Sequence, residues 1–207
     1  MDSTWLRDFP KRRLPFIIAT GGEFIALFFW FRFFNDGRYI LATIVLFAGF
    51  LTERLAVLYW VKVNFGAQVG ITGQHKTPLQ RLVGLLAITV SEIFVWMAFF
   101  LAADHINLFV GGVILFIGEQ LQHSWDLALL NGKRIADYLV HPTAIVITVI
   151  EVSGGIALYH FYKSEQALLA GGIILVALAV EHVVQGGMIA PSAPPQQGSV
   201  PAQPATT

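Results

Sequence analysis

The sequence predicts an all-α integral membrane protein whose six transmembrane helices form three helical hairpins, related by an internal pseudo-threefold repeat. Three observations support this prediction. The chain of 207 residues is 56% hydrophobic and only 13% charged, whereas soluble domains carry about 25% charged residues. Six apolar segments are each long enough to cross a bilayer. Each of these segments also contains one glutamate near its middle.

The six predicted spans follow one another in pairs. They cover roughly residues 14–34, 39–61, 82–103, 107–130, 140–162 and 167–189. Each span has about 21–24 residues, enough for a helix to cross a hydrocarbon core of ~30 Å. The short connections NDGR, DHI and KSEQ separate the two members of each pair. They predict three antiparallel hairpins within one transmembrane domain at 14–189.

The basic residues predict the orientation of the chain. Nine of them lie in the N-terminal segment, in the 62–81 connection and in the 131–139 connection, and three lie on the opposite side. Because cytoplasmic loops are enriched in Lys and Arg, both termini are predicted to be cytoplasmic. The N-terminal segment is 1–13. The Pro-rich tail, 190–207, lacks the apolar residues of a core and is predicted to be disordered.

One glutamate lies near the middle of each predicted span. Of the seven glutamates only Glu165 falls in a connection, and the other six are Glu23, Glu53, Glu92, Glu119, Glu151 and Glu181. The two glutamates of each hairpin are 30, 27 and 30 residues apart, and the first of each pair follows a similar string, TGGE, TVSE or TVIE. A charged side chain at the bilayer centre costs about 2.5–3.5 kcal/mol on insertion scales. These residues are therefore expected to face the interior of the bundle.

The fourth predicted span is the most polar. In its stretch LFIGEQLQHSWDLALL, Glu119, His123 and Asp126 are four and three positions apart, so they form one stripe along a helix. Gln122 lies off this stripe and is expected to bond to a neighbouring helix. The stripe predicts an interior site on this helix.

The sixth span adds a second histidine. His182 directly follows Glu181, and Gln185 shares the face of that glutamate. Arg54 is the single basic side chain at this depth. The predicted cation, proton or metal site comprises Glu23, Glu53, Glu92, Glu119, His123, Glu151, Glu181 and His182, with Arg54, Asp126 and Gln185 in support.

Three functions fit this pattern. A cation- or proton-coupled transporter or channel is favoured, because intramembrane acids mark ion and proton pathways and repeats suit a carrier with a midplane site. The first alternative is a membrane-embedded, di-iron-like oxidoreductase that binds a divalent transition metal and acts on a lipid-soluble substrate. The last four spans offer four Glu and two His, the ligand count of ferritin-like centres, although glutamate and histidine are four and one positions apart instead of three and three. These residues are Glu92, Glu119, His123, Glu151, Glu181 and His182. The second alternative is an accessory subunit whose neutral glutamates form hydrogen bonds across helices.

Composition excludes several other classes. A net charge of zero gives no case for nucleic acid, and the absence of cysteine excludes disulfides and thiolate metal ligands. The lipid bilayer is the expected partner, together with a second copy of the chain or a larger membrane complex. Whether the chain is an enzyme stays open at this point.

Overall fold

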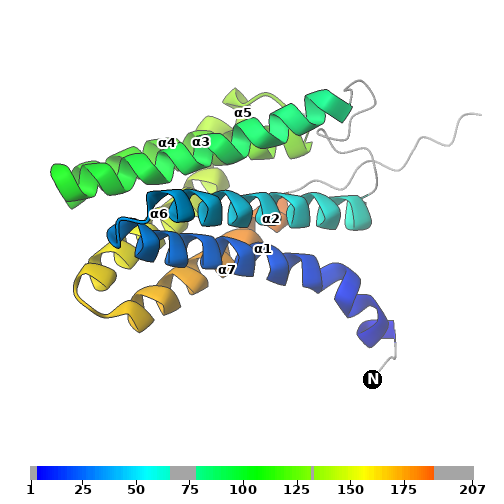
Figure 1. Cartoon of the computed structure of the whole chain (residues 1–207). Helices are drawn as coiled ribbons and strands as arrows, with labels where there is room; N and C mark the ends of the chain where they lie inside the picture. The colour runs from blue at the N-terminus through cyan, green and yellow to red at the C-terminus, as the bar shows by residue number, and fades with distance from the viewer. Residues whose placement is uncertain (1–3, 66–77, 132, 189–207) are drawn as a thin grey trace, which may run out of the picture.

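The computed structural model describes residues 4–65, 78–131 and 133–188, and these residues form seven helices and no strand. The helices are α1 (Thr4–Asn35), α2 (Tyr39–Phe65), α3 (Pro78–His105), α4 (Leu108–Asn131), α5 (Ala136–Leu139), α6 (Pro142–Lys163) and α7 (Ala167–Met188). The six long helices run alongside one another (Figure 1). The predicted all-α class is confirmed for the described part of the chain.

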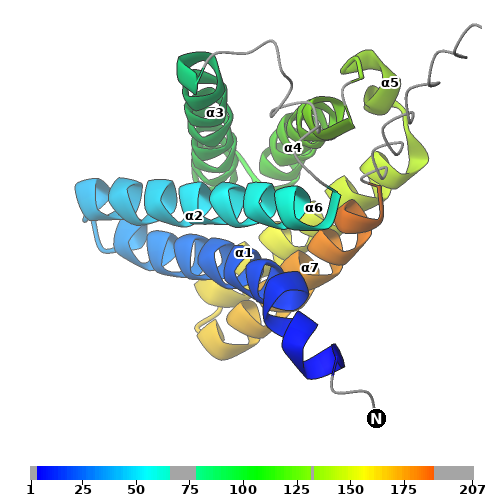
Figure 2. The same cartoon turned by 90° about the vertical axis from the view of Figure 1, so that its right-hand side faces the viewer.

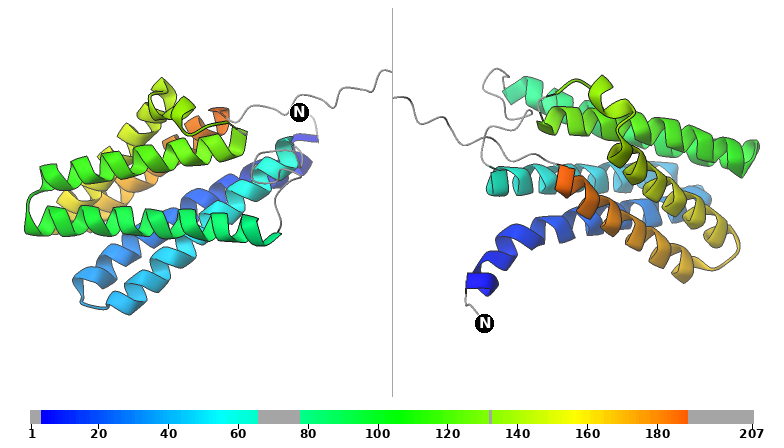
Figure 3. Two further views of the ribbon diagram at one scale, coloured as in Figure 1. Left: turned by 90° about the horizontal axis from the view of Figure 1, so that it is seen from above. Right: turned by 180° about the vertical axis from the view of Figure 1, so that it is seen from behind.

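The long helices pair as the short connections predicted. The helices α1 and α2, α3 and α4, and α6 and α7 pack against each other as hairpins. Their three turns lie at one end of the bundle, at the left in Figure 1. The first turn uses Gly37 at φ +73°, a left-handed conformation that glycine adopts without steric cost. The α1–α2 hairpin is inclined to the α3–α4 hairpin (Figure 3, left panel).

Five of the described helices are long and apolar enough to cross a membrane. The spans are Leu14–Asn35, Tyr39–Trp60, Leu82–His105, Pro142–Lys163 and Ala167–Gln185. They support a multi-pass membrane protein. The helix α4 is not among them, because its second half carries the polar residues that were singled out in the sequence. The predicted cytoplasmic position of both termini stays a prediction.

The structure describes the predicted terminal segments and connections to different extents. The helix α1 already begins at Thr4, so most of the 1–13 segment continues the first helix. The tail 190–207 and the central part of the 62–81 connection lie outside the described residues. The 131–139 connection contains α5, which the sequence analysis did not predict and which lies at the periphery beside α4 (Figure 2).

Gln120 connects α5 and α6 to α4. Its Nε2 donates a hydrogen bond to the Leu139 carbonyl at 2.9 Å, and its Oε1 accepts one from Thr148 Oγ1 at 2.8 Å. The ring of Tyr138 is buried in a small apolar cluster with Leu127 and with two alanines of α4 and α6. The connection is therefore packed against the bundle.

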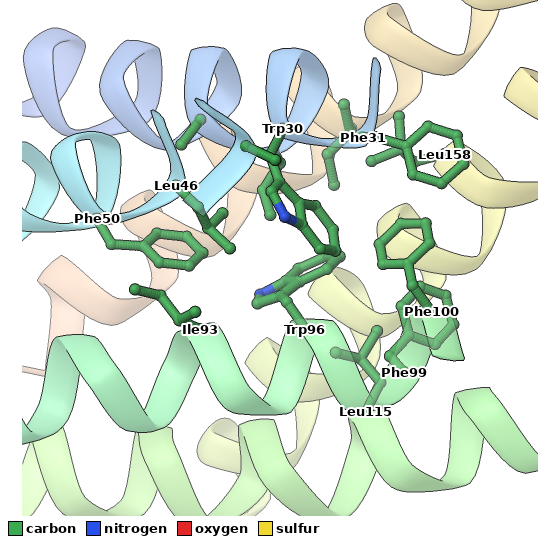
Figure 4. Packing of buried hydrophobic residues seen from close by; sticks show 14 of the residues in the cluster. Trp30, Phe31, Leu46, Phe50, Ile93, Trp96, Phe99, Phe100, Leu115 and Leu158 are labelled. Carbon is green, nitrogen blue, oxygen red and sulfur yellow. The ribbon is translucent and has the colours of Figure 1, made fainter. Parts of the chain in front are cut away.

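A layer of aromatic side chains fills the half of the bundle nearest the hairpin turns (Figure 4). Trp30, Phe31, Trp96, Phe99 and Phe100 are each at most 1% exposed. Phe100 lies at the centre, with its ring centroid 4.7 Å from that of Trp30 and 4.5 Å from that of Phe31. Such edge-on and tilted pairs are favourable beyond their burial. The layer leaves this half of the bundle tightly packed.

A polar clasp joins the three hairpins just beyond the aromatic layer. Lys163 Nζ of α6 lies 3.0 Å from Asp104 Oδ1 of α3, and it donates to Asn35 Oδ1 of α1 at 3.0 Å. Tyr159 Oη donates to the same aspartate oxygen at 2.6 Å. These four side chains come from all three hairpins, so their contacts link the hairpins to one another near the turns.

Small residues allow the closest approach of two helices in the α1–α2 hairpin. A Cβ atom placed on Gly49 would lie 2.1 Å from Ala26 Cβ and 2.7 Å from the Gly22 carbonyl oxygen. A Cβ atom on Gly21 would meet nothing within 4 Å. Small residues at such contacts let helix backbones approach in lipid, where van der Waals packing drives association.

We expect Gly49→Ala to destabilise the protein, because the added methyl group forces α1 and α2 apart. Overpacking of this kind costs roughly 1–3 kcal/mol. Gly21→Ala on the facing helix is the matched control and should be neutral or mildly stabilising. Thermal unfolding in detergent measures both, and equal midpoints for the two variants would contradict the close contact.

Candidate functional site

The six mid-span glutamates converge on one small cavity at the middle of the bundle. Glu23, Glu53, Glu92, Glu119, Glu151 and Glu181 all line it, together with Arg54, Gln122, His123, Asp126 and Gln185. Each of the glutamates is at most 5% exposed. Every long helix contributes one of them, so the interior position that was expected for these residues is what the structure describes.

Arg54 organises one side of the cavity. Its Nη2 donates to Glu92 Oε2 at 2.7 Å, its Nη1 bonds to Asp126, and its Nε lies 3.2 Å from Glu53 Oε2. One guanidinium therefore meets three carboxylates from α2, α3 and α4. The planar fork of arginine suits this task, because its donors point in fixed directions. Asp126, which shares the sequence stripe of Glu119, belongs to this arginine cluster.

The two histidines face carboxylates of α1, α2, α6 and α7. His123 Nε2 lies 3.0 Å from Glu151 Oε2 and 3.4 Å from Glu181 Oε1. His182 Nε2 lies 3.7 Å from Glu23 Oε2 and 3.6 Å from Glu53 Oε1. Each imidazole thus has one ring nitrogen directed at a pair of acids.

The position of the His182 ring is fixed by the backbone. Its Nδ1 lies 2.9 Å from the carbonyl oxygen of Leu178, and Thr20 Oγ1 lies 3.3 Å from the same nitrogen. A carbonyl oxygen only accepts, so Nδ1 carries the proton in the neutral ring and Nε2 presents its lone pair to the cavity. Carbonyl-oriented imidazoles of this kind are typical of metal-ligating histidines.

Three sets of side chains are close enough to hold a metal ion, and the sets overlap. They are Glu23 with Glu181 and His182, Glu119 with His123 and Glu151, and Glu23 with Glu92 and Glu151. Within each set the ligand atoms lie within 4.8 Å of one another. Glu23 and Glu151 each belong to two sets, so they lie where a bridging carboxylate of a multinuclear centre would lie.

Several buried atoms of the site have no hydrogen-bond partner among the described residues. They include Glu119 Oε1, Glu151 Oε2, Glu181 Oε2 and His123 Nδ1. An unsatisfied buried polar atom costs about 1–3 kcal/mol, and more where the group is charged. Protons, cations or buried water molecules would satisfy these oxygens.

Hydrogen bonds behind the acids position α4. Ser91 Oγ of α3 donates to Gln122 Oε1 at 2.9 Å, as expected for a glutamine that lies off the polar stripe. Gln185 also lines the cavity, one helical turn after Glu181 on α7.

The sequence analysis missed three threonines. Thr20, Thr89 and Thr148 each precede the first glutamate of a hairpin by three positions, and all three are buried. Thr20 contacts His182, and Thr148 holds Gln120. The signal was present in the strings TGGE, TVSE and TVIE, whose shared Thr falls on the face of the glutamate.

No protein-family model matches this chain, and neither does any curated protein or solved structure. The interpretation of the site therefore rests on its own residues.

We expect Arg54→Met to be strongly destabilising, because it leaves three buried carboxylates without their cation. Removing one partner of a buried ion pair typically costs about 3–5 kcal/mol. Arg32→Met is the control, since Arg32 is 64% exposed and lies 3.7 Å from Asp36. An exposed pair contributes roughly 0–1 kcal/mol. Thermal unfolding midpoints measure both effects. Equal midpoints for the two variants would contradict the role of Arg54 as the cation of these three carboxylates.

Proposed function

We propose that this chain is a membrane-embedded metalloprotein with a dinuclear, carboxylate-bridged centre, acting as an oxidoreductase on a lipid-soluble substrate. The observation that carries the proposal is the convergence of six mid-span glutamates and His123 on one cavity, with His182 close enough to Glu23 and Glu181 to complete a second set of metal ligands. One ion would be held by Glu119, His123 and Glu151. The other would be held by Glu23, Glu181 and His182.

The donor set favours metal ions over protons alone. Unless His182 Nε2 carries a proton, its lone pair is directed at two carboxylates, and that arrangement is repulsive without a cation between them. Mixed carboxylate and imidazole ligands suit iron, manganese, cobalt or zinc more than calcium or magnesium. Redox-active metals at such a centre supply one-electron and oxygen chemistry. The protein's own residues bind the ions and hold their ligands in register.

Charge supports two divalent ions. Seven carboxylates line the cavity, and one guanidinium is present to offset them. Two divalent cations would neutralise the four glutamates that do not contact Arg54, and two protons shared among Glu53, Glu92 and Asp126 would complete the balance around the arginine. The inventory of four Glu and two His equals that of the ferritin-like di-iron centres, although the spacing of glutamate to histidine differs.

We further propose that α4 is the sixth membrane span. Its polar residues are buried, whereas its outward positions, four residues apart, are the apolar Phe109, Val113, Ile117 and Leu121. A helix with this division can face lipid on one side and a polar site on the other. The pseudo-threefold repeat is part of the proposal, since each hairpin brings two glutamates and one buried threonine to the same level.

A carrier is the second candidate. The observation that favours it is the asymmetry of the bundle, with a packed aromatic layer on one side of the cavity and a pocket on the other. A midplane site that is accessible from one side is what an alternating-access carrier presents. The glutamates gather around one cavity and are not spread along the length of the bundle, which argues against an open channel.

We expect the purified chain to retain about two transition-metal ions, the number held by di-iron-type centres. Glu119→Gln and Glu151→Gln should each lower the content to about one ion or less, because each removes a charged ligand. Glu165→Gln, in the exposed α6–α7 turn, is the matched control and should keep the full content. Inductively coupled plasma mass spectrometry of folded, monodisperse protein measures this. A folded wild-type chain without metal would reject the centre and leave the accessory-subunit alternative.

Reconstitution in liposomes separates the enzyme from the carrier. For the enzyme we expect Mn²⁺ to stay outside liposomes that contain the chain, with an internal metal-sensitive dye as the readout. For the carrier, Mn²⁺ enters, and Glu151→Gln abolishes entry whereas Glu165→Gln does not. Entry with this mutational pattern would replace the enzyme proposal by the carrier.

A further inference from the structure

A third set of carboxylates links the two ion positions of the proposed centre. The two ligand sets that include a histidine have no residue in common. The third set consists of Glu23, Glu92 and Glu151, and it shares Glu23 with one of these sets and Glu151 with the other. Its ligand oxygens lie within 4.8 Å of one another. Of the three sets, this carboxylate set alone contains only oxygen ligands.

The carboxylate set takes one residue from each hairpin. Glu23 lies on α1, Glu92 on α3 and Glu151 on α6, so each is the first glutamate of its hairpin. These are the glutamates that end the strings TGGE, TVSE and TVIE. Three residues in matching sequence positions therefore meet around one point, which the other two sets do not do.

The space beside these carboxylates is small and bordered by unpartnered oxygens. All three residues line the glutamate cavity, whose free volume is about 10 Å³. Roughly this volume is needed for a single water molecule, so the cavity admits one small particle and no organic group. Glu151 is 1% exposed, and its Oε2 makes no hydrogen bond with a described residue. Glu119 Oε1 and Glu181 Oε2, on the same cavity, are also unpartnered.

Charge favours a cation over a water molecule in this space. Seven carboxylates and one guanidinium line the cavity, so two divalent ions at the histidine-containing sets leave a surplus of two negative charges. One further divalent cation removes this surplus, in place of two protons around Arg54. Buried charges are tolerated when they are compensated in this way.

We propose that Glu23, Glu92 and Glu151 bind a third divalent cation of the hard class, Mg²⁺ or Mn²⁺. Ligand sets made only of oxygen suit hard cations, whereas the imidazoles of the other two sets suit softer transition metals. The small cavity favours Mg²⁺ or Mn²⁺ over Ca²⁺, which takes more ligands at longer distances. The inference rests on the proposed function for the two ions on either side.

The third cation binds more weakly than the other two ions. Glu92 Oε2 accepts a hydrogen bond from Arg54 Nη2 at 2.7 Å, so this carboxylate divides its charge between the guanidinium and the ion. Arg54 is also a positive neighbour that repels a cation. The third position therefore fills last and empties first, which is why the purified chain is expected to keep two ions and not three.

The test uses the full chain in detergent, loaded with about two equivalents of Zn²⁺ and then titrated with Mn²⁺ as the probe. Zn²⁺ outcompetes Mn²⁺ at sites with nitrogen ligands, so bound Mn²⁺ reports on the carboxylate set. The electron paramagnetic resonance signal of free Mn²⁺ measures binding. We expect one Mn²⁺ per chain, which excess Mg²⁺ displaces. Glu92→Gln keeps an acceptor for Arg54 but should raise the Kd for Mn²⁺ about a hundredfold or more, because it removes a charged ligand.

Glu53→Gln is the matched control. Glu53 Oε2 lies 3.2 Å from Arg54 Nε, and Glu53 lines the same cavity but belongs to none of the three sets. The variant removes the same charge without removing a ligand, so its Kd for Mn²⁺ should change less than about tenfold. Glu165→Gln, in the exposed α6–α7 turn, should bind Mn²⁺ as the wild type does.

Zinc content of the same samples separates this inference from the proposed function. A chain that holds its Zn²⁺ but binds no Mn²⁺ overturns the third site and leaves the dinuclear centre in place. Equal Mn²⁺ binding by the wild type and Glu92→Gln, or equal weakening in Glu92→Gln and Glu53→Gln, overturns Glu92 as a ligand. A chain that takes up no Zn²⁺ but binds one Mn²⁺, which Glu92→Gln loses, overturns the dinuclear centre and leaves the carboxylate set. The Mn²⁺ stoichiometry of the wild type decides the outcome even where Glu92→Gln does not fold.

Discussion

The burial of seven carboxylates with one guanidinium is the constraint on which the rest of this structure depends. Charges in a low-dielectric interior are tolerated only when they are paired, protonated or bound to cations. Arg54 takes three of the acids and thereby fixes α2, α3 and α4 relative to one another. The other four face two histidines instead of lysines or arginines. That division brings imidazole nitrogens and carboxylate oxygens together, a combination of ligands that suits a transition metal.

The hairpin architecture serves this cavity by bringing two glutamates from each of the three hairpins to it. Close backbone contacts at Gly49 and packed aromatic rings around Phe100 make the half near the turns rigid. The clasp of Lys163 ties the same ends together from outside. The other half of the bundle has fewer such devices and contains a small apolar pocket between α1, α2 and α7. The tightly packed half and the half with the pocket therefore lie at opposite ends of the bundle, and the glutamates lie between them.

Much of the site was predictable from the sequence, because an acid in an apolar span has only one favourable direction to face. The six glutamates, both histidines and the hairpin pairing follow from that rule and from the turn lengths. The partners of Arg54 were not predictable, because they depend on how α2, α3 and α4 rotate against each other. Glu181 and His182 illustrate the same limit. They point about 100° apart on a helix, yet Glu181 lines the cavity and His182 lies against Glu23 and Glu53 at its edge.

The structure explains this divergence through the position of α7. Glu181 turns to His123 of α4, and His182 turns to Glu23 of α1 and Glu53 of α2. Two adjacent residues thus serve opposite sides of the cavity, and a spacing of three or four would have directed both to one side. The same divergence brings the His182 ring into the wall of the apolar pocket, one turn from Gln185. A ligand of the proposed centre is for this reason also a wall of the small apolar pocket between α1, α2 and α7.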